Sequence, residues 1–241
     1  MSAPVHAPAA AGTATPGGAH PPLLAATGVR KRFGATVALT DASLSIAPGE
    51  IVAVMGPSGS GKSTLLHCLA GIVTPDAGRV TFRDRDLTTM SDAERSALRR
   101  SDFGFVFQFG QLVPELTCLE NVALPLRLDG VSRRAAETRA ARWLETLDVA
   151  DVAHKRQGEV SGGQGQRVAI ARALATEPAV VSADEPTGAL DSLNGERVMQ
   201  LLTAAARERG IAVVLVTHEA RVAAYSDREV VVRDGRTPDR A

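Results

Sequence analysis

Cysteine is scarce in this 241-residue sequence, which contains only Cys68 and Cys118. Two cysteines do not make a disulfide framework or a zinc site, and no cluster of histidine and cysteine accompanies them. This excludes the small secreted domains that depend on disulfides, and a reducing, cytosolic setting fits. A chain of this length buries a sizeable core without such cross-links.

Long apolar runs are also missing. A membrane-spanning helix needs about 18 consecutive apolar residues, whereas runs such as 51–55 have only the length of a strand. Residues 1–22 are rich in Ala, Pro and Gly but lack the basic start and continuous apolar stretch of a secretory signal. We expect residues 1–22 to be a disordered tail and residues 237–241 a second tail. Any contact with a membrane is expected to run through a partner.

The chain has no excess charge of either sign, since 27 Lys and Arg balance 27 Asp and Glu. Proteins that bind nucleic acid through a basic field carry surplus positive charge, so no nucleic-acid partner is expected. Lysine itself is rare, because only Lys31, Lys62 and Lys155 occur among the basic residues. One of these three, Lys62, falls within the clearest motif of the sequence.

Four apolar runs have the length and continuity of strands that are buried on both faces. They are residues 51–55, 179–183, 211–216 and 229–233. Helix-compatible stretches separate them, and strands that alternate with helices predict a mainly parallel sheet in an α/β domain. Residues 37–39, 42–46 and 79–90 show strand-like character outside this series.

Three stretches predict helices: residues 62–71, which end at Gly71, residues 92–100, and residues 132–148 with Ser132 as the N-cap. Apolar side chains of the last stretch form one helical stripe. They are Ala136, Ala140, Trp143, Leu144 and Leu147. Because no convincing buried strand occurs between about residues 93 and 160, we predict a helical insertion there, within a domain spanning residues 23–236.

Residues 56–63 match the phosphate-loop pattern G-x-x-x-x-G-K-[ST], between a buried strand and a helix. Glycines let main-chain N–H groups approach phosphate oxygens, and the helix N-terminus favours the same anion. Lys62 adds a compact cation, and the Ser63 hydroxyl suits Mg²⁺. The alternative is an ordinary glycine-rich turn from strand to helix.

Polar side chains follow two of the predicted strands. Asp184 and Glu185 come after the run 179–183, where open α/β sheets bind ligands. Asp184 suits a Mg²⁺ ion, and Glu185 is placed to polarise an attacking water. His218 follows the run 211–216 at the same edge of the sheet and is expected to contact a γ-phosphate. The alternative for Asp184 and Glu185 is a solvated acidic turn after a strand. The alternative for His218 is a structural role.

A second glycine turn, Ser161-Gly162-Gly163-Gln164, precedes the helical pattern 165–174 and predicts another anion site at a helix N-terminus. It lies about a hundred residues beyond the phosphate loop and outside the parallel-sheet pattern. Two chains placed head to tail would bring each phosphate loop to the other chain's glycine turn. The alternative is a plain helix cap.

Together these motifs resemble the ATP-binding subunit of an ABC transporter, over residues 23–236. Residues 56–63 resemble Walker A, residues 161–164 the signature, Asp184 the Walker B aspartate, and Gly188-Ala189-Leu190-Asp191 the D-loop. Gln108 resembles the Q-loop glutamine, and Phe33 stands where the family has an aromatic residue that stacks on adenine. The resemblance implies that the following residues bind nucleotide: Phe33, Gly56, Pro57, Ser58, Gly59, Ser60, Gly61, Lys62, Ser63, Thr64, Gln108, Ser161, Gly162, Gly163, Gln164 and Asp191.

The resemblance also implies a P-loop NTPase fold, with a RecA-like, mainly parallel sheet, an antiparallel β subdomain and a helical subdomain. ATP and Mg²⁺ are the expected cofactors, with Ser63, Gln108 and Asp184 at the metal. Glu185 and His218 are the expected catalytic residues. A second copy of the chain, or a paralogue, would complete the head-to-tail dimer. The departures from the family pattern are Val160, Gly165 and Ser182, of which Ser182 needs a hydrogen-bond partner if buried.

Residues 105–108, 112–117, 120–125 and 186–191 resemble the lipoprotein-release and macrolide-efflux group of these ATPases. That implies export or extrusion of lipid, lipoprotein, peptide or drug through an FtsX-like permease, with the chain on the inner face of the plasma membrane. A non-transport ABC ATPase of DNA repair or ribosomes, or a nucleotide-gated regulator of a membrane complex, is the alternative. The first of these usually adds a coiled coil or a second ATPase domain, and the patterns in residues 1–241 predict neither.

The docking site for a permease is expected near residues 108–126, which are apolar for a surface loop. Burial of the same side chains in the helical insertion is an equal alternative. Arg95, Arg99 and Arg100 would flank such a site, and an ordinary solvated face is the favoured reading of these three.

Overall fold

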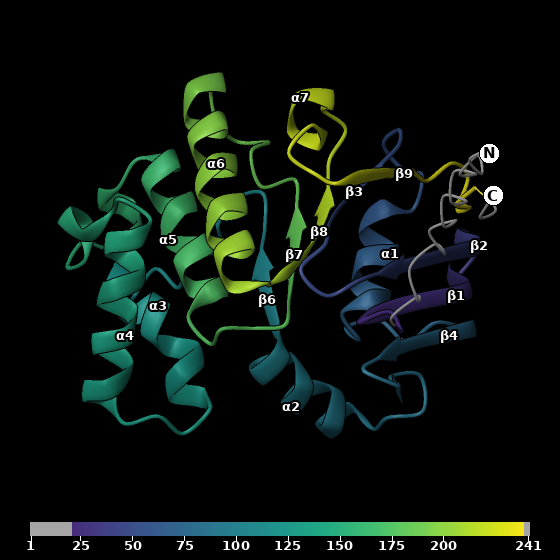
Figure 1. Ribbon diagram of the computed structural model, residues 1–241, viewed down its shortest axis with the longest axis horizontal. Coiled ribbons are helices and arrows are strands. Elements are labelled where there is room, and N and C mark those ends of the chain that lie inside the picture. The colour runs from purple at the N-terminus through teal and green to yellow at the C-terminus, as the bar shows by residue number, and fades with distance from the viewer. Residues whose placement is uncertain (1–20, 239–241) are drawn as a thin grey trace, which may run out of the picture.

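The computed structural model describes residues 21–238, which form two sheets and a helical region (Figure 1). One sheet is parallel, with strand order β6-β7-β8-β3-β9. Its strands are β3 (Ile51–Met55), β6 (Phe103–Val106), β7 (Val180–Asp184), β8 (Ala212–Val216) and β9 (Arg228–Val231). The four predicted apolar runs thus provide four of the five strands. Strands β3, β7 and β8 are buried on both faces, whereas the edge strand β9 is exposed or half-buried.

The second sheet is antiparallel, with strand order β2-β1-β4-β5. Its strands are β1 (Leu24–Phe33), β2 (Thr36–Ile46), β4 (Ala77–Phe82) and β5 (Arg85–Asp86). One face of it packs with α1 (Lys62–Leu69) and the parallel sheet in a shared apolar core. The expected division into a parallel core and an antiparallel subdomain is confirmed.

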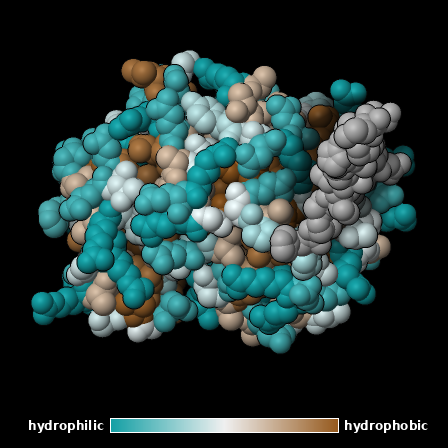
Figure 2. All heavy atoms as spheres, in the orientation of Figure 1, coloured by the Kyte–Doolittle hydropathy of each residue, from teal (hydrophilic) through white to brown (hydrophobic). Residues whose placement is uncertain are grey.

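The remaining helices lie mostly on the other side of the parallel sheet (Figure 1). They are α2 (Asp92–Asp102), α3 (Cys118–Leu128), α4 (Arg133–Thr146), α5 (Gly162–Leu174), α6 (Ser192–Arg209) and α7 (Ala220–Ala223), with 3₁₀ turns at Ala150–Val152 and Gln157–Glu159. Strand β7 separates the two cores, since Val180 packs on the α1 side and Val181 on the helical side. The outer face seen in Figure 2 is mostly hydrophilic, with scattered hydrophobic residues.

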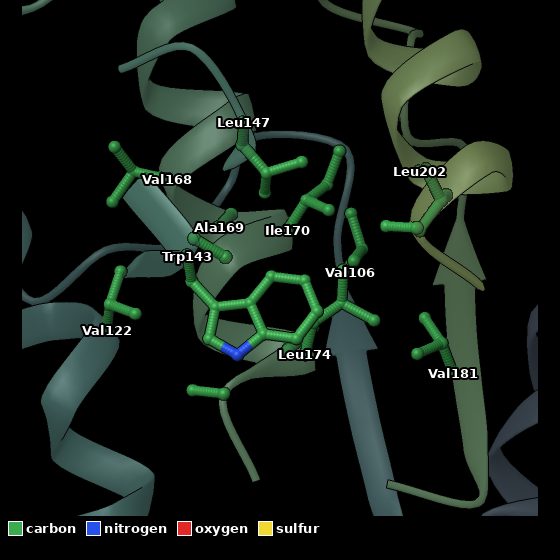
Figure 3. Close-up of a cluster of buried hydrophobic side chains, with 14 of the residues drawn as sticks. Val106, Val122, Trp143, Leu147, Val168, Ala169, Ile170, Leu174, Val181 and Leu202 are labelled. Atoms are coloured by element: carbon green, nitrogen blue, oxygen red, sulfur yellow. The ribbon is translucent and has the colours of Figure 1, made fainter. Parts of the chain in front are cut away.

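The core of the helical region forms around Trp143, as Figure 3 shows. The predicted stripe of α4 is buried there, and Trp143 itself is 5% exposed. Ser132 is the N-cap residue of α4, as expected, but its side chain makes no capping hydrogen bond. This packing fixes α4 against α3 and α5.

The prediction that residues 93–160 contain no strand is wrong. Strand β6 runs from Phe103 to Val106 and pairs with β7 at the edge of the parallel sheet. It has only four residues and includes Gly104, so it gives no apolar run long enough to detect. Gly104 is needed there, because a Cβ atom would lie 2.3 Å from the carbonyl oxygen of Ala173. The continuous helical part begins only at α3.

The two predicted tails fall mostly outside the described residues. The C-terminal tail was expected from residue 237, but Thr237 belongs to the folded domain. The Thr237 hydroxyl accepts a hydrogen bond from Ser43 N at 2.8 Å and donates one to Ser43 O at 2.8 Å. Within residues 21–238, no helix has the length and apolar character required to cross a membrane.

Candidate active site

The phosphate loop, residues 56–63, joins β3 to α1 and turns on glycines in the left-handed region. Gly56, Gly59 and Gly61 have φ angles of 140°, 76° and 103°. A Cβ atom on Gly56 would lie 2.2 Å from Val232 O, and one on Gly61 would lie 2.4 Å from Ala38 O. Neither position accepts a side chain, so glycine is required at both for the loop main chain to lie this close to its neighbours.

Lys62 is the first residue of α1 and is only 8% exposed. Its ammonium group donates hydrogen bonds to Gly56 O at 2.9 Å and Pro57 O at 2.8 Å. A buried cation is costly unless its donors are satisfied, and here two loop carbonyl groups accept from two of the three ammonium donors. The loop and its lysine are therefore already arranged as a compact, positively charged cradle.

Ser63 and Asp184 come together from different elements of the fold. The Ser63 hydroxyl donates to Asp184 Oδ1 at 3.2 Å, and Asp184 ends β7 beside Val216 of β8. A hydroxyl and a carboxylate at this spacing supply the oxygen ligands that Mg²⁺ prefers. No group of three His, Cys, Asp or Glu side chains in residues 21–238 forms a metal cluster of its own.

Glu185 follows Asp184 with φ of 46°, which is uncommon for a residue other than glycine. Its main-chain N–H donates to Val216 O at 2.9 Å, which helps to hold the turn. Its carboxylate lies 3.0 Å from His218 Nδ1, which comes from the segment after β8. The strained turn therefore directs the Glu185 side chain, which follows β7, toward His218, which follows β8.

A pocket of about 620 Å³ collects most of these groups. Its lining comprises Thr36, Val37, Ala38, Pro57, Ser58, Gly59, Gly61, Lys62, Ser63, Thr64, Glu185 and His218. Sequence reasoning missed Thr36, Val37 and Ala38, because a strand without titratable side chains carries no chemical signal. They reach the pocket because β2 passes beside the phosphate loop, where Ala38 O approaches Gly61.

Phe33 lies at the rim rather than in the pocket lining. It is 50% exposed and pairs across the β1–β2 turn with Thr36, which does line the pocket. The Lys31 ammonium lies 5.5 Å from the centre of the Phe33 ring. One aromatic ring is thus available beside the pocket, in keeping with a ring that stacks on a base.

The Gln108 segment, residues 107–111, follows β6 and approaches the site from the helical side. A Cβ atom on Gly188 would lie 2.8 Å from Gln108 Nε2, so the glutamine packs against the segment after Glu185. In the described residues Gln108 makes no hydrogen bond with Ser63 or Asp184. Its place at the metal stays a prediction.

The signature turn, residues 161–164, starts α5 and stands apart from the pocket lining. Ser161 and Gln164 form a capping box, with Gln164 N donating to Ser161 Oγ at 3.3 Å and Ser161 N to Gln164 Oε1 at 3.0 Å. A Cβ atom on Gly163 would lie 2.7 Å from Asn194 Oδ1. One chain thus contains both the phosphate loop and the signature turn, but only the phosphate loop lines the pocket.

Asp191 caps α6 and fixes Asn194 behind the signature turn. Its carboxylate accepts hydrogen bonds from Asn194 N at 2.9 Å and Asn194 Nδ2 at 2.7 Å. These hydrogen bonds, the main-chain one first, hold the pKa of Asp191 below its ordinary value. Asn194 was missed in the sequence, because its packing on Gly163 depends on two helices meeting.

Two of the noted departures have structural outcomes. Gly165 lies within the first turn of α5, which begins at Gly162. Ser182 is 2% exposed, and its hydroxyl has no hydrogen-bond partner among the described residues. The expected need of Ser182 for a partner is therefore unmet by the protein itself.

The comparisons with known proteins agree with this geometry. A family model described as ABC transporter matches residues 39–188. The chain belongs to the ABC transporter family. It is an ATP-binding, ATP-hydrolysing subunit of that family, as the motifs predict. The family accounts for the phosphate loop, the signature turn and the strand-end carboxylates in one chain.

Curated relatives match over most of their length. The lipoprotein-releasing system ATP-binding protein LolD 2 of Caulobacter vibrioides is 44% identical over 218 residues, covering 89% of this chain and 96% of the relative. LolD of Granulibacter bethesdensis is 47% identical over 199 residues, covering 83% and 87%. These ABC transporter relatives both carry the lipoprotein-releasing name.

Solved structures give the same result. A dimeric post-hydrolysis state of the ATP-binding cassette MJ0796, bound to ADP and Pi, has a TM-score of 0.82 and 40% identity. It covers 90% of this chain, which covers 97% of it. Another dimeric structure of MJ0796, described as a bacterial ABC transporter cassette, has a TM-score of 0.82 and 41% identity. The fold of an ABC ATPase is thus confirmed.

Proposed function

We propose that two copies of this chain, or one copy and a paralogue, close head to tail around two ATP molecules and drive the release of lipoproteins through a membrane permease. The observation that carries the proposal is an incomplete site. The pocket holds the phosphate loop, Glu185 and His218, whereas the signature turn of the same chain lies elsewhere. A second chain supplies the missing turn, and the similar MJ0796 structures are described as dimeric.

Within each site, the phosphate loop and Lys62 bind the β- and γ-phosphates, and the exposed face of Phe33 stacks on adenine. Ser63 and Asp184, whose side chains lie 3.2 Å apart, would hold Mg²⁺, and Gln108 would supply a further oxygen ligand. The ion, when bound, neutralises charge on the phosphate oxygens. From the partner subunit, the signature turn donates main-chain N–H groups to the γ-phosphate, and the D-loop around Asp191 packs beside it.

For hydrolysis, Glu185 orients a water molecule and accepts its proton. The hydroxide oxygen bonds to the γ-phosphorus while the bond from this phosphorus to the β–γ bridging oxygen breaks, leaving ADP and phosphate. His218 Nδ1, 3.0 Å from Glu185 Oε1, positions the carboxylate, and with both ring nitrogens protonated Nε2–H donates to a γ-phosphate oxygen. Loss of the γ-phosphate removes the contact that holds the dimer closed.

The permease is proposed to dock in a groove of about 530 Å³ between the parallel sheet and α3. Leu128 and Ile72 line this groove and are 63% and 45% exposed. Arg99 and Arg100 also line it, whereas Arg95 pairs with Asp92 instead. Apolar residues rimmed by cations fit a short amphipathic segment of a membrane protein. An FtsX-like permease at the inner face of the plasma membrane is the proposed partner.

The burial of the stretch 108–126 is mixed. Leu112 is buried at 6% exposure, whereas Phe109 is 70% exposed. An exposed docking surface and burial in the helical insertion were the two alternatives from the sequence, and each applies to different side chains. The exposed members are the ones available to a partner.

Co-purification tests this function. The tagged chain, extracted with detergent in nucleotide-free buffer, is expected to recover a polytopic membrane protein, and added lipid-modified protein is expected to change the ATPase rate of the complex. Leu128→Glu should lose the membrane protein without altering the melting temperature, because the side chain is exposed. Leu193→Glu, at a residue 79% exposed but outside the groove, is the matched control. Recovery of the chain alone would refute the transport function.

A further inference from the structure

Two side chains of α5 hold the Gln108 segment by its main chain. Gln166 Nε2 donates to Phe107 O at 2.8 Å. Arg172 donates from Nη2 to Gly110 O at 2.8 Å and from Nη1 to Gln111 O at 2.7 Å. These three carbonyl groups lie on both sides of Gln108. The helix that begins with the signature turn therefore binds the segment that carries the glutamine.

The burial of the two donors makes these contacts strong. Gln166 is 3% exposed. Arg172 is partly buried, and this burial lowers the pKa of its guanidinium. No carboxylate in residues 21–238 forms an ion pair with Arg172. Its charge is thus stabilised mainly by the two carbonyl groups, and a desolvated cation binds such acceptors tightly.

The backbone of the segment is shaped to reach the arginine. Gly110 and Gln111 have φ angles of 68° and 46°, so two successive residues are left-handed. This bend turns their carbonyl groups toward one guanidinium, whose fork geometry suits two acceptors. A Cβ atom on Gly110 would lie 3.4 Å from Gln166 Oε1 and 3.6 Å from Ala169 Cβ. The segment therefore lies directly on α5.

We propose that Gln166 and Arg172 are positioning residues that make the Gln108 segment and the signature turn move as one body. The inference rests on the head-to-tail dimer of the proposed function. In that dimer Gln108 serves the nucleotide of its own chain, while the signature turn serves the nucleotide of the partner. Arg172 and Gln111 also line the docking groove, so a displacement there passes through α5 to the opposite site.

Two near-isosteric variants break this connection. Gln166→Glu keeps the side-chain shape but sets a carboxylate against Phe107 O. Arg172→Lys keeps the charge but loses the fork that joins two carbonyl groups. The matched control is Arg167→Lys on the same helix, because Arg167 donates to Asp148 O at 3.4 Å, outside the segment.

The readout is dimer formation with ATP, measured by light scattering in a Glu185→Gln background that does not turn over. Both variants are expected to weaken dimerisation about tenfold or more, since bonds of charged or buried donors are lost. Arg167→Lys should dimerise like the parent. Calorimetry should find ADP binding to the monomer within about twofold of the parent in every variant, because the phosphate loop makes none of these contacts.

The pH dependence separates positioning from general damage. A protonated Glu at position 166 can donate to Phe107 O, so the defect of Gln166→Glu should shrink as the pH falls, whereas that of Arg172→Lys should not. If the Glu185→Gln parent protein stays monomeric with ATP, both the proposed dimer and this inference are refuted. A parent that dimerises, together with both variants dimerising equally well, overturns this inference alone.

Discussion

At the scale of single residues, two groups of the candidate site have unusual local geometry. Glu185 occupies a left-handed conformation that an ordinary turn would avoid, and Lys62 is buried among carbonyl groups. Such positions cost free energy, of order 1–3 kcal/mol for a strained backbone. They persist because the strands around them fix both residues. Two substitutions test the roles of these side chains.

Glu185→Gln should leave ATP binding intact and lower turnover by about two or more orders of magnitude, because the amide cannot accept a proton from water. Phosphate release in the steady state measures turnover, and calorimetry measures binding. Glu219→Gln is the control, since Glu219 pairs with Arg221 and does not line the pocket. Unchanged turnover in Glu185→Gln would remove Glu185 from catalysis.

Lys62→Ala should weaken nucleotide binding about ten- to a hundredfold, because hydrogen bonds of a charged donor contribute about 1.5–3 kcal/mol each. Titration of ATP by calorimetry measures the change. Lys155→Ala removes a lysine that lies outside the pocket and should bind like the parent. Normal affinity in Lys62→Ala would contradict the phosphate-loop assignment.

At the scale of elements, the decisive contact lies between α5 and α6. The signature turn opens α5, and Asn194, held by Asp191 at the start of α6, fills the space beside Gly163. The turn is therefore shaped by a neighbouring helix as well as by its own capping box. This packing explains why Gly163 and Gly165, both near the start of α5, should differ in their response to substitution.

Gly163→Ala should lower ATPase activity at least tenfold with little change in ADP affinity, because its Cβ atom would lie 2.7 Å from Asn194 Oδ1 and displace the turn. Gly165→Ala is the matched control. Its Cβ atom would meet only Val160 Cγ2, at 3.8 Å, so activity should be kept. The alanine should add about 0.5–1 kcal/mol of stability through helix propensity, visible as a melting temperature a few degrees higher. Equal activities of the two variants would show that the Asn194 contact is unimportant.

At the scale of the whole molecule, the parallel sheet separates two apolar cores, and each encloses one cysteine. Cys68 packs on the α1 side and Cys118 on the helical side. Burial raises the pKa of the Cys68 thiol to about 12 and also raises that of Cys118. Both thiols thus report on the opening of their own core.

Native protein at pH 8 should react slowly with a disulfide reagent such as dithionitrobenzoate, because both thiols are buried and remain protonated at that pH. Two thiols should titrate quickly once guanidinium unfolds the chain. Raising the pH within the native range should speed labelling little, since a raised pKa keeps the thiolate fraction small. Rapid labelling of one thiol in the native protein would show that its core opens readily.

The sequence by itself determined four of the five strands of the parallel sheet, the phosphate loop, the carboxylates at the strand end and the family, because these depend on local patterns. Continuous apolar runs, glycines at fixed spacing and a lysine before a serine are read without knowing distant neighbours. Residues 56–63, Asp184, Glu185 and His218 were found in this way, and the structure brings Ser63 to Asp184 and Glu185 to His218.

Only the tertiary structure decided the rest, because those contacts join elements far apart in the chain. Strand β6 is too short to be predicted from its sequence pattern. It forms by pairing with the edge of β7. Ala38 lines the pocket because β2 lies beside the phosphate loop. Arg172 donates hydrogen bonds to two carbonyl groups about sixty residues earlier in the chain. The separation of the signature turn from the pocket is likewise a property of the fold. It follows from the packing of α5 on the helical side of the sheet, which no local pattern encodes.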